Sequence, residues 1–159
     1  MQPQIKTTSQ KKLIGRKVIM SMAENKTAQL WQSFMPQIKN IKNRVNNELI
    51  SMEIYNSDYF KKFNPAQTFE KWAVTEVSDI SEIPDGMESF IIEEGLYAMF
   101  IYKGTANNAA DFFKRIFNDI LPSSGFDVDN RPHFAVMGDK YKNNDPESEE
   151  EIWIPVRNK

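Results

Sequence analysis

Two segments of the chain place a glutamate two residues before a tryptophan: Glu70 precedes Trp72, and Glu151 precedes Trp153. Successive side chains of a β-strand point to opposite faces, so each pair shares one face if both segments are strands. An indole ring attracts a cation, and a partly desolvated carboxylate supplies the complementary charge. The spacing therefore predicts a binding site for a cationic or aromatic ligand. The competing interpretation makes each tryptophan part of the core and each glutamate a solvated edge charge.

Catalytic groups are otherwise scarce in this sequence. It contains no cysteine and His133 is its one histidine, which excludes thiol nucleophiles, disulfides and a His-rich metal site. It also contains no Gly-x-Ser-x-Gly elbow and no glycine-rich phosphate loop. A hydrolase would have to use Glu151 or Glu70 as its general base, with Tyr97 assisting. We therefore expect no metal and no cofactor, haem included, and a structural or surface role for His133.

The overall charge argues against a nucleic-acid partner. The chain carries 20 basic and 22 acidic side chains, mixed along its 159 residues, for a formal net charge of -2. Such a surface offers no basic field to attract phosphates. The polar residues 1–12 and the lack of a long apolar run predict neither a signal peptide nor a membrane span. We therefore expect a cytoplasmic protein, and the length suits one domain over residues 1–159.

The residues of interest fall in two runs of elements, about residues 5–78 and 87–156. In the first run, alternation and amphipathic spacing predict a strand, a helix and two strands, at residues 5–22, 27–41, 48–55 and 69–78. Thr27 can cap the helix, and Pro36 implies a kink or an early end. The last two strands are expected to form a hairpin with a long polar loop.

The second run contains the same kinds of element. Its strands are predicted at residues 87–93, 96–103, 132–137 and 151–156, with a helix between the second and the third. Asn107 or Asn108 can cap this helix, and Pro122 stops it. Because the order of elements repeats, we expect an α+β fold of duplicated strand-helix-strand-strand modules with pseudo-twofold symmetry, antiparallel strands and two main helices. Such packing leaves a central cleft where the halves meet, a preferred place for a ligand.

Three motifs in this order resemble the GyrI-like small-molecule-binding domain, which is also the effector-binding domain of many AraC-type and MerR-type bacterial regulators. The motifs are EGLYAMFIYKG at residues 94–104, RPHF at residues 131–134 and EIWIPV at residues 151–156. The resemblance covers roughly residues 12–156. It implies a pair of strand-helix-strand-strand modules around a ligand cleft.

The resemblance also implies roles for individual residues. Glu151 matches a last-strand glutamate that faces cationic or amphipathic ligands, and Glu70 is its counterpart in the first half. The aromatic residues that match the ligand-stacking walls are Trp72, Tyr97, Trp153 and Phe134. One departure concerns charge, because relatives often have Phe-Glu where this chain has Phe134-Ala135. No helix-turn-helix is found in the sequence, so the chain resembles the standalone members of the family, which do not contact DNA themselves.

The leading hypothesis is therefore a binding module for a hydrophobic, cationic small molecule, related to transcription regulation. Two alternatives stay open. One is a hydrolase of reactive small molecules that depends on Glu151. The other is a protein-interaction or inhibitor module, whose contact with a regulator or another partner protein is made by the acidic loop at residues 139–150.

Overall fold

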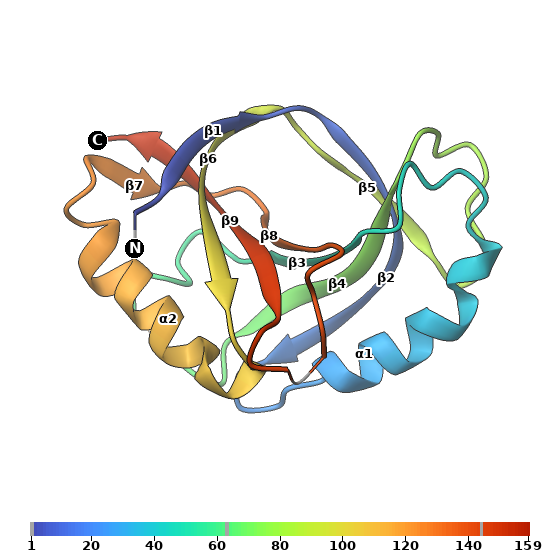
Figure 1. Cartoon of the computed structure of the whole chain (residues 1–159), viewed down its shortest axis with the longest axis horizontal. Helices are drawn as coiled ribbons and strands as arrows, with labels where there is room; N and C mark the ends of the chain where they lie inside the picture. The colour runs from blue at the N-terminus through green and yellow to red at the C-terminus, as the bar shows by residue number, and fades with distance from the viewer. Residues whose placement is uncertain (1, 63, 144) are drawn as a thin grey trace.

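The computed structural model describes residues 2–62, 64–143 and 145–159. Within these residues the chain forms nine β-strands and two α-helices (Figure 1). The strands are β1 (Gln4–Thr8), β2 (Lys11–Ser21), β3 (Leu49–Ile54), β4 (Thr68–Val77), β5 (Glu88–Ile92), β6 (Gly95–Lys103), β7 (Phe126–Val128), β8 (His133–Met137) and β9 (Glu149–Asn158). The helices are α1 (Thr27–Phe34) and α2 (Ala109–Arg115). The predicted α+β class is confirmed.

All strand pairs are antiparallel, and the sheet has the order β1-β6-β9-β8-β3-β4-β2-β5, with β7 paired to β9. The run β2-α1-β3-β4 and the run β6-α2-β8-β9 have the same element order. The two runs meet at the central pair of β3 and β8. From β8 outward the strands are β9, β6 and β1, and from β3 outward they are β4, β2 and β5. The predicted duplication with pseudo-twofold symmetry is therefore visible in the strand order.

The two edge strands are exchanged between the runs. β1 precedes β2 in the chain but pairs with β6, and β5 precedes β6 but pairs with β2. Residues 9–10 and residues 93–94 are the only links between these consecutive strands. Because such short links span little distance, the two ends of the sheet must come close together. The sheet is therefore strongly curved, as Figure 1 shows.

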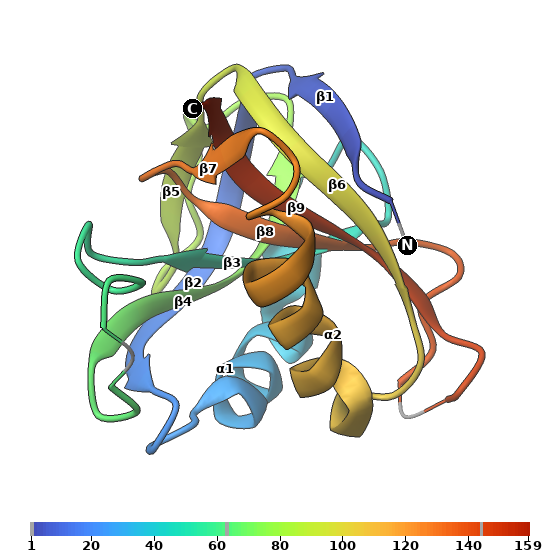
Figure 2. The ribbon, with the colours of Figure 1, turned by 90° about the vertical axis from the view of Figure 1, so that its left-hand side faces the viewer.

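Both helices cover the convex face of the sheet, where Figure 2 shows them beneath the strands. One apolar cluster joins α1 to β2 and β4, through Leu30 and Phe34 against Ile14 and Ala73. A second cluster joins α2 and the turn after it to β6 and β9. The concave face carries a third cluster, contributed by strands alone: Leu13, Ile50, Met52, Trp72, Val74, Ile92, Tyr97, Phe134 and Val136.

The helix boundaries correct one detail of the predicted helices. Thr27 is the first residue of α1 rather than its cap, because Lys26 occupies the N-cap position. As expected from Pro36, α1 ends at Phe34 and continues as the 3₁₀ turn η1 (Met35–Asn40). Asn108 is the N-cap of α2, and the helix continues as a π-helical turn over Ile116–Ile120.

The strand boundaries also differ from the predictions. The predicted first strand is two strands, because the chain breaks between β1 and β2 so that β1 can pair with β6. The short strand β7 was not predicted. The last strand begins at Glu149, because β9 remains paired with β6 as far as Lys103 and Glu149. Glu149 and Glu150 are therefore strand residues and not part of the loop.

Candidate functional site

The six predicted site residues lie on the concave face of the sheet. Along β9, Ile152, Ile154 and Val156 pack toward α2, whereas Trp153 packs against the concave cluster. Strand alternation places Glu151 on the side of Trp153, and along β4 it places Glu70 on the side of Trp72. Tyr97, Phe134 and Trp72 are themselves members of the concave cluster.

Each glutamate is hydrogen-bonded to the tryptophan that follows it in the same strand. The Nε1 of Trp72 donates to Oε1 of Glu70 at 3.0 Å. The Nε1 of Trp153 donates to Oε1 of Glu151, also at 3.0 Å. Each carboxylate is thus held beside an indole ring, which is the arrangement that the spacing in the sequence predicted.

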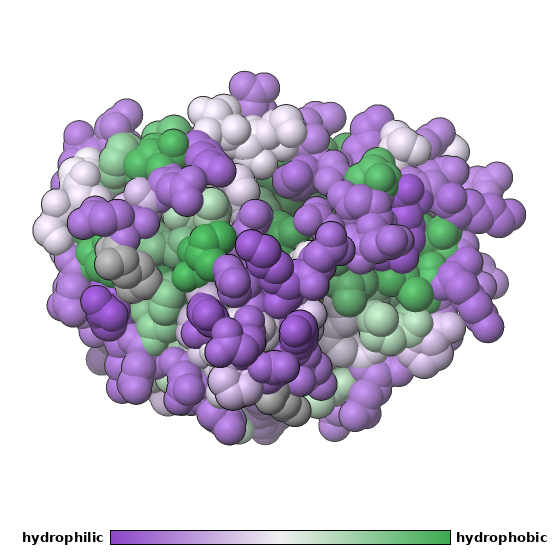
Figure 3. All heavy atoms as spheres, viewed as in Figure 1, coloured by the Kyte–Doolittle hydropathy of each residue, from purple (hydrophilic) through white to green (hydrophobic). Residues whose placement is uncertain are grey.

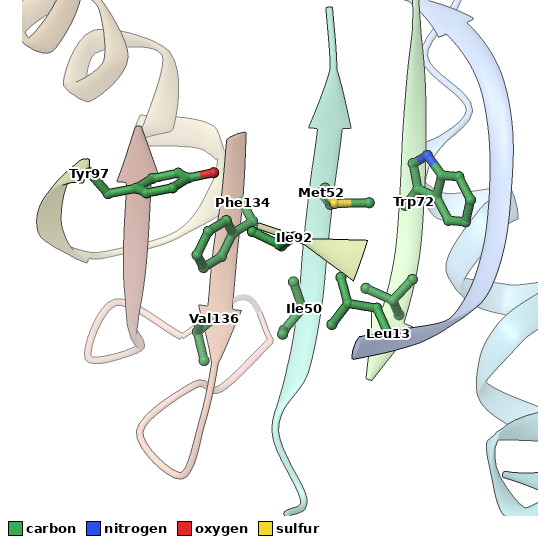
Figure 4. Close-up of a cluster of buried hydrophobic side chains, with 9 residues drawn as sticks. Leu13, Ile50, Met52, Trp72, Ile92, Tyr97, Phe134 and Val136 are labelled. Carbon is green, nitrogen blue, oxygen red and sulfur yellow. The ribbon is translucent and has the colours of Figure 1, made fainter. Parts of the chain in front are cut away.

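One row of side chains crosses the middle of the concave face, from β4 to β9. Strand register places Met52 of β3 directly opposite both Trp72 and Phe134. Phe134 of β8 is in turn opposite Trp153 of β9. The two tryptophans are therefore separated by Met52 and Phe134, and Figure 4 shows Trp72, Met52 and Phe134 in succession across neighbouring strands.

The aromatic residues divide into two groups. Tyr97, Phe134 and Trp153 form one group: Phe134 and Trp153 are stacked at 5.4 Å between ring centroids, and Tyr97 lies 5.2 Å from Phe134. Trp72 belongs to the other group, with the ring of Phe90 at 5.5 Å. The structure thus brings all six predicted residues to one face, but it does not bring the two tryptophans into contact.

The two glutamates carry uncompensated charge. Among the residues that the structure describes, neither Glu70 nor Glu151 forms a salt bridge with a basic side chain. Each has a neutral indole N–H as its hydrogen-bond donor instead. A carboxylate beside an aromatic surface and without a cation is a favourable contact for an incoming positive charge.

Two basic side chains are already stacked on the aromatic walls. The guanidinium carbon of Arg131 lies 4.9 Å from the centroid of the Tyr97 ring, and Nζ of Lys17 lies 5.3 Å from that of Trp72. Lys17 was not among the predicted site residues. The signal that could have found it is its pairing with Trp72, which requires the register of β2 and β4.

The hydroxyl of Tyr97 is protonated and held in place. Burial raises the pKa of Tyr97 to about 12, an effect that the charge of Arg131 opposes and that of Asp129 reinforces. The hydroxyl donates a hydrogen bond to the backbone carbonyl of Pro132 at 2.7 Å. Tyr97 therefore contributes an aromatic surface, and its hydroxyl is not free to assist a general base.

Exposed apolar side chains lie beside both glutamates of the concave face. Ile19 of β2 is 52% exposed and lies opposite Glu70, and Ile101 of β6 is 43% exposed and lies opposite Glu151. Figure 3 shows hydrophilic residues across the middle of the molecule in the view of Figure 1, with hydrophobic atoms in the recess between them.

The interior of the concave face is filled by its own side chains. Met52 is fully buried, and Tyr97 and Phe134 are almost so. Two cavities lie elsewhere: one of about 830 Å³ between η1 and residues 79–85, and one of about 230 Å³ beside Phe60 and Arg131. A ligand that reaches the aromatic rings must therefore displace side chains of this face.

Two sequence features prove to lie on the helix-covered side. His133 is buried there against the rings of Tyr55 and Phe60, and burial, aided by the charge of Arg131, lowers its pKa to about 3. Ala135 belongs to the cluster around α2. The departure from Phe-Glu at this position therefore leaves the charge of the concave face unchanged.

The acidic residues on either side of the start of β9 differ in exposure, because Glu147 is 73% exposed whereas Glu150 is half-buried. Burial, with the charge of Glu53, raises the pKa of Glu150, which stands in the strand. Glu147 in the loop forms a salt bridge of 3.0 Å with Lys103.

No helix of the described residues has the length and apolar character needed to span a membrane.

Comparison with protein families gives a match over almost the whole chain. A sequence profile of the GyrI-like small-molecule-binding domain matches residues 1–157. Over 145 residues the chain is 26% identical to the transcriptional regulator BrlR of Pseudomonas aeruginosa. This alignment covers 91% of the chain and 51% of BrlR, so the chain spans about half the length of that relative.

Two solved structures share the fold. SAV2435 bound to tetraphenylphosphonium superposes with a TM-score of 0.76 and 16% identity, covering 99% of this chain and 94% of the other. A protein from Staphylococcus aureus MU50, described as a putative bacterial transcription regulation protein, gives a TM-score of 0.70 and 15% identity, covering 99% of both chains.

Proposed function

The chain belongs to the family of GyrI-like small-molecule-binding domains, and we propose that its ligand is a lipophilic cation bound on the concave face of the sheet. Glu151 is the charge partner in this proposal, and Trp153, Tyr97 and Phe134 are the aromatic walls. Glu70 and Trp72 form the corresponding pair of the other half.

The observation that carries the proposal is the state of the Glu151 carboxylate. It accepts a hydrogen bond from Trp153 and, among the described residues, has no basic partner. A ligand cation placed against Trp153 would gain both cation-π attraction and a charge partner. The exposed Ile101 beside Glu151 offers contact to the apolar part of such a ligand.

The similar proteins support this choice of ligand class. Tetraphenylphosphonium, the molecule named with SAV2435, is a monovalent cation surrounded by four aromatic rings. The regulator BrlR supports a further role for this chain as an effector-binding module in transcription regulation, with a regulator as its partner. The chain spans about half of BrlR, so this role is proposed from the shared half alone.

A thermal-shift screen with three classes of compound tests the ligand class, because a ligand that binds only the native state raises the melting temperature. The probes are tetraphenylphosphonium for lipophilic cations, tetraphenylmethane derivatives without charge, and tetraphenylborate for lipophilic anions. We expect stabilisation by the cation only. Stabilisation by all three would show that the charge of Glu151 is irrelevant, and no response to any of them would favour the interaction module with a protein partner.

A further inference from the structure

The two Glu-x-Trp pairs stand in matching surroundings that differ at one position. Glu70 lies opposite Ile19, and Glu151 lies opposite Ile101, so the acidic residue has an isoleucine neighbour in both halves. The residue opposite the tryptophan is not matched. Lys17 stands opposite Trp72, whereas the corresponding residue opposite Trp153 is Met99.

Lys17 places a positive charge on the ring of Trp72. Its Nζ lies 5.3 Å from the ring centroid, within the range of a cation-π contact. Oε1 of Glu88 lies 3.5 Å from the same amine, and the Lys17 side chain is 35% exposed. The amine thus lies on the ring of Trp72, where a ligand cation would otherwise stack.

Met99 leaves the other pair free of positive charge. Its side chain is 3% exposed and is neutral. Among the described residues, no basic group is stacked on Trp153, whose ring instead lies parallel to that of Phe134. The two Glu-x-Trp pairs therefore share a frame but differ in the side chain opposite the tryptophan, and the basic group of the second half, Arg131, is stacked on Tyr97 and not on Trp153.

We propose that Lys17 is a specificity-determining residue that covers the ring of Trp72 in the half-site of Glu70 and Trp72. The concave face then takes one cation, at Glu151 and Trp153. This inference rests on the proposed function and assigns the ligand to one of two similar places.

Calorimetric titration of tetraphenylphosphonium into Lys17→Met tests the inference, since methionine is the residue found at the matching position. We expect Lys17→Met to bind a second equivalent of the cation where the unmodified protein binds one, because the substitution frees the ring of Trp72. Lys17→Arg keeps the charge and should bind as the unmodified protein does. Lys114→Met, on the exposed surface of α2, removes the same charge from the helix side and should change nothing.

The outcomes separate this inference from the proposed function. If the unmodified protein and Lys17→Met both bind one equivalent of the cation, the role of Lys17 is overturned and the proposed function stands. A second equivalent bound to both Lys17→Met and Lys17→Arg also overturns it, because the positive charge of Lys17 would not be the cause. Binding only after Lys17→Met would support a blocking role for Lys17. The absence of binding to all variants overturns the proposed function and this inference with it.

Discussion

The indole N–H of Trp153 donates a hydrogen bond to the carboxylate of Glu151 at 3.0 Å, between two side chains on one face of β9. The contact fixes the carboxylate against the edge of the ring and leaves it without a basic partner among the described residues. The same distance separates the donor and acceptor of Trp72 and Glu70.

Replacement of Trp153 by phenylalanine should weaken the binding of tetraphenylphosphonium by about 1–2 kcal/mol. Phenylalanine keeps an aromatic face, but it loses the N–H that orients Glu151 and offers a weaker cation-π surface than indole. Calorimetry measures the loss. Trp31→Phe, on α1 and away from the groove, is the matched control. Unchanged affinity in Trp153→Phe would place the ligand elsewhere.

Truncation of Met52 should lower the free energy of unfolding by about 2–5 kcal/mol, the usual cost of a buried large-to-small substitution. Met52 is fully buried at the centre of the row that separates the two tryptophans. Chemical denaturation of Met52→Ala measures the change. Met35→Ala is the control, because Met35 is 42% exposed and should cost little. Equal effects of the two substitutions would contradict the packing described for the concave face.

The buried, neutral His133 should make the protein less stable as the pH falls. Its folded-state pKa of about 3 lies below the ordinary value of 6.5, so the unfolded chain binds more protons between these limits. Stability therefore declines as the pH is lowered from about 6.5 toward 3. Denaturation of His133→Phe at several pH values should show a flatter profile over this window than the unmodified protein. Parallel profiles would mean that His133 titrates equally in both states.

Local patterns predicted the elements better than their pairing. The two Glu-x-Trp pairs were assigned to one strand face correctly, because the alternation of side chains depends only on adjacent residues. Pro36 likewise ended α1 where the chain cannot form the helical hydrogen bond. The exchange of β1 and β5 between the halves was not foreseen, since it depends on contacts between residues distant in sequence.

The role assigned to Lys17 shows the same limit. Alternation along β2 places Lys17 and Ile19 on one face and Val18 and Met20 on the other, but alternation alone does not tell what the face with Lys17 meets. Because the sheet is curved, the face with Lys17 is the concave face, where Lys17 lies opposite Trp72. A sequence pattern states which residues share a face, and the global shape of the sheet decides what that face meets.

The most direct test of the account is calorimetric titration of tetraphenylphosphonium into the unmodified protein and into Glu151→Gln. Glutamine keeps the size of the side chain and an oxygen that can accept from Trp153, so the change removes chiefly the charge. We expect affinity to fall by about 1–3 kcal/mol, the cost typical of losing a charged partner. Glu82→Gln is the control, because Glu82 is a surface residue whose side chain is 72% exposed. Equal affinity in Glu151→Gln and the unmodified protein would contradict a cation site at Glu151.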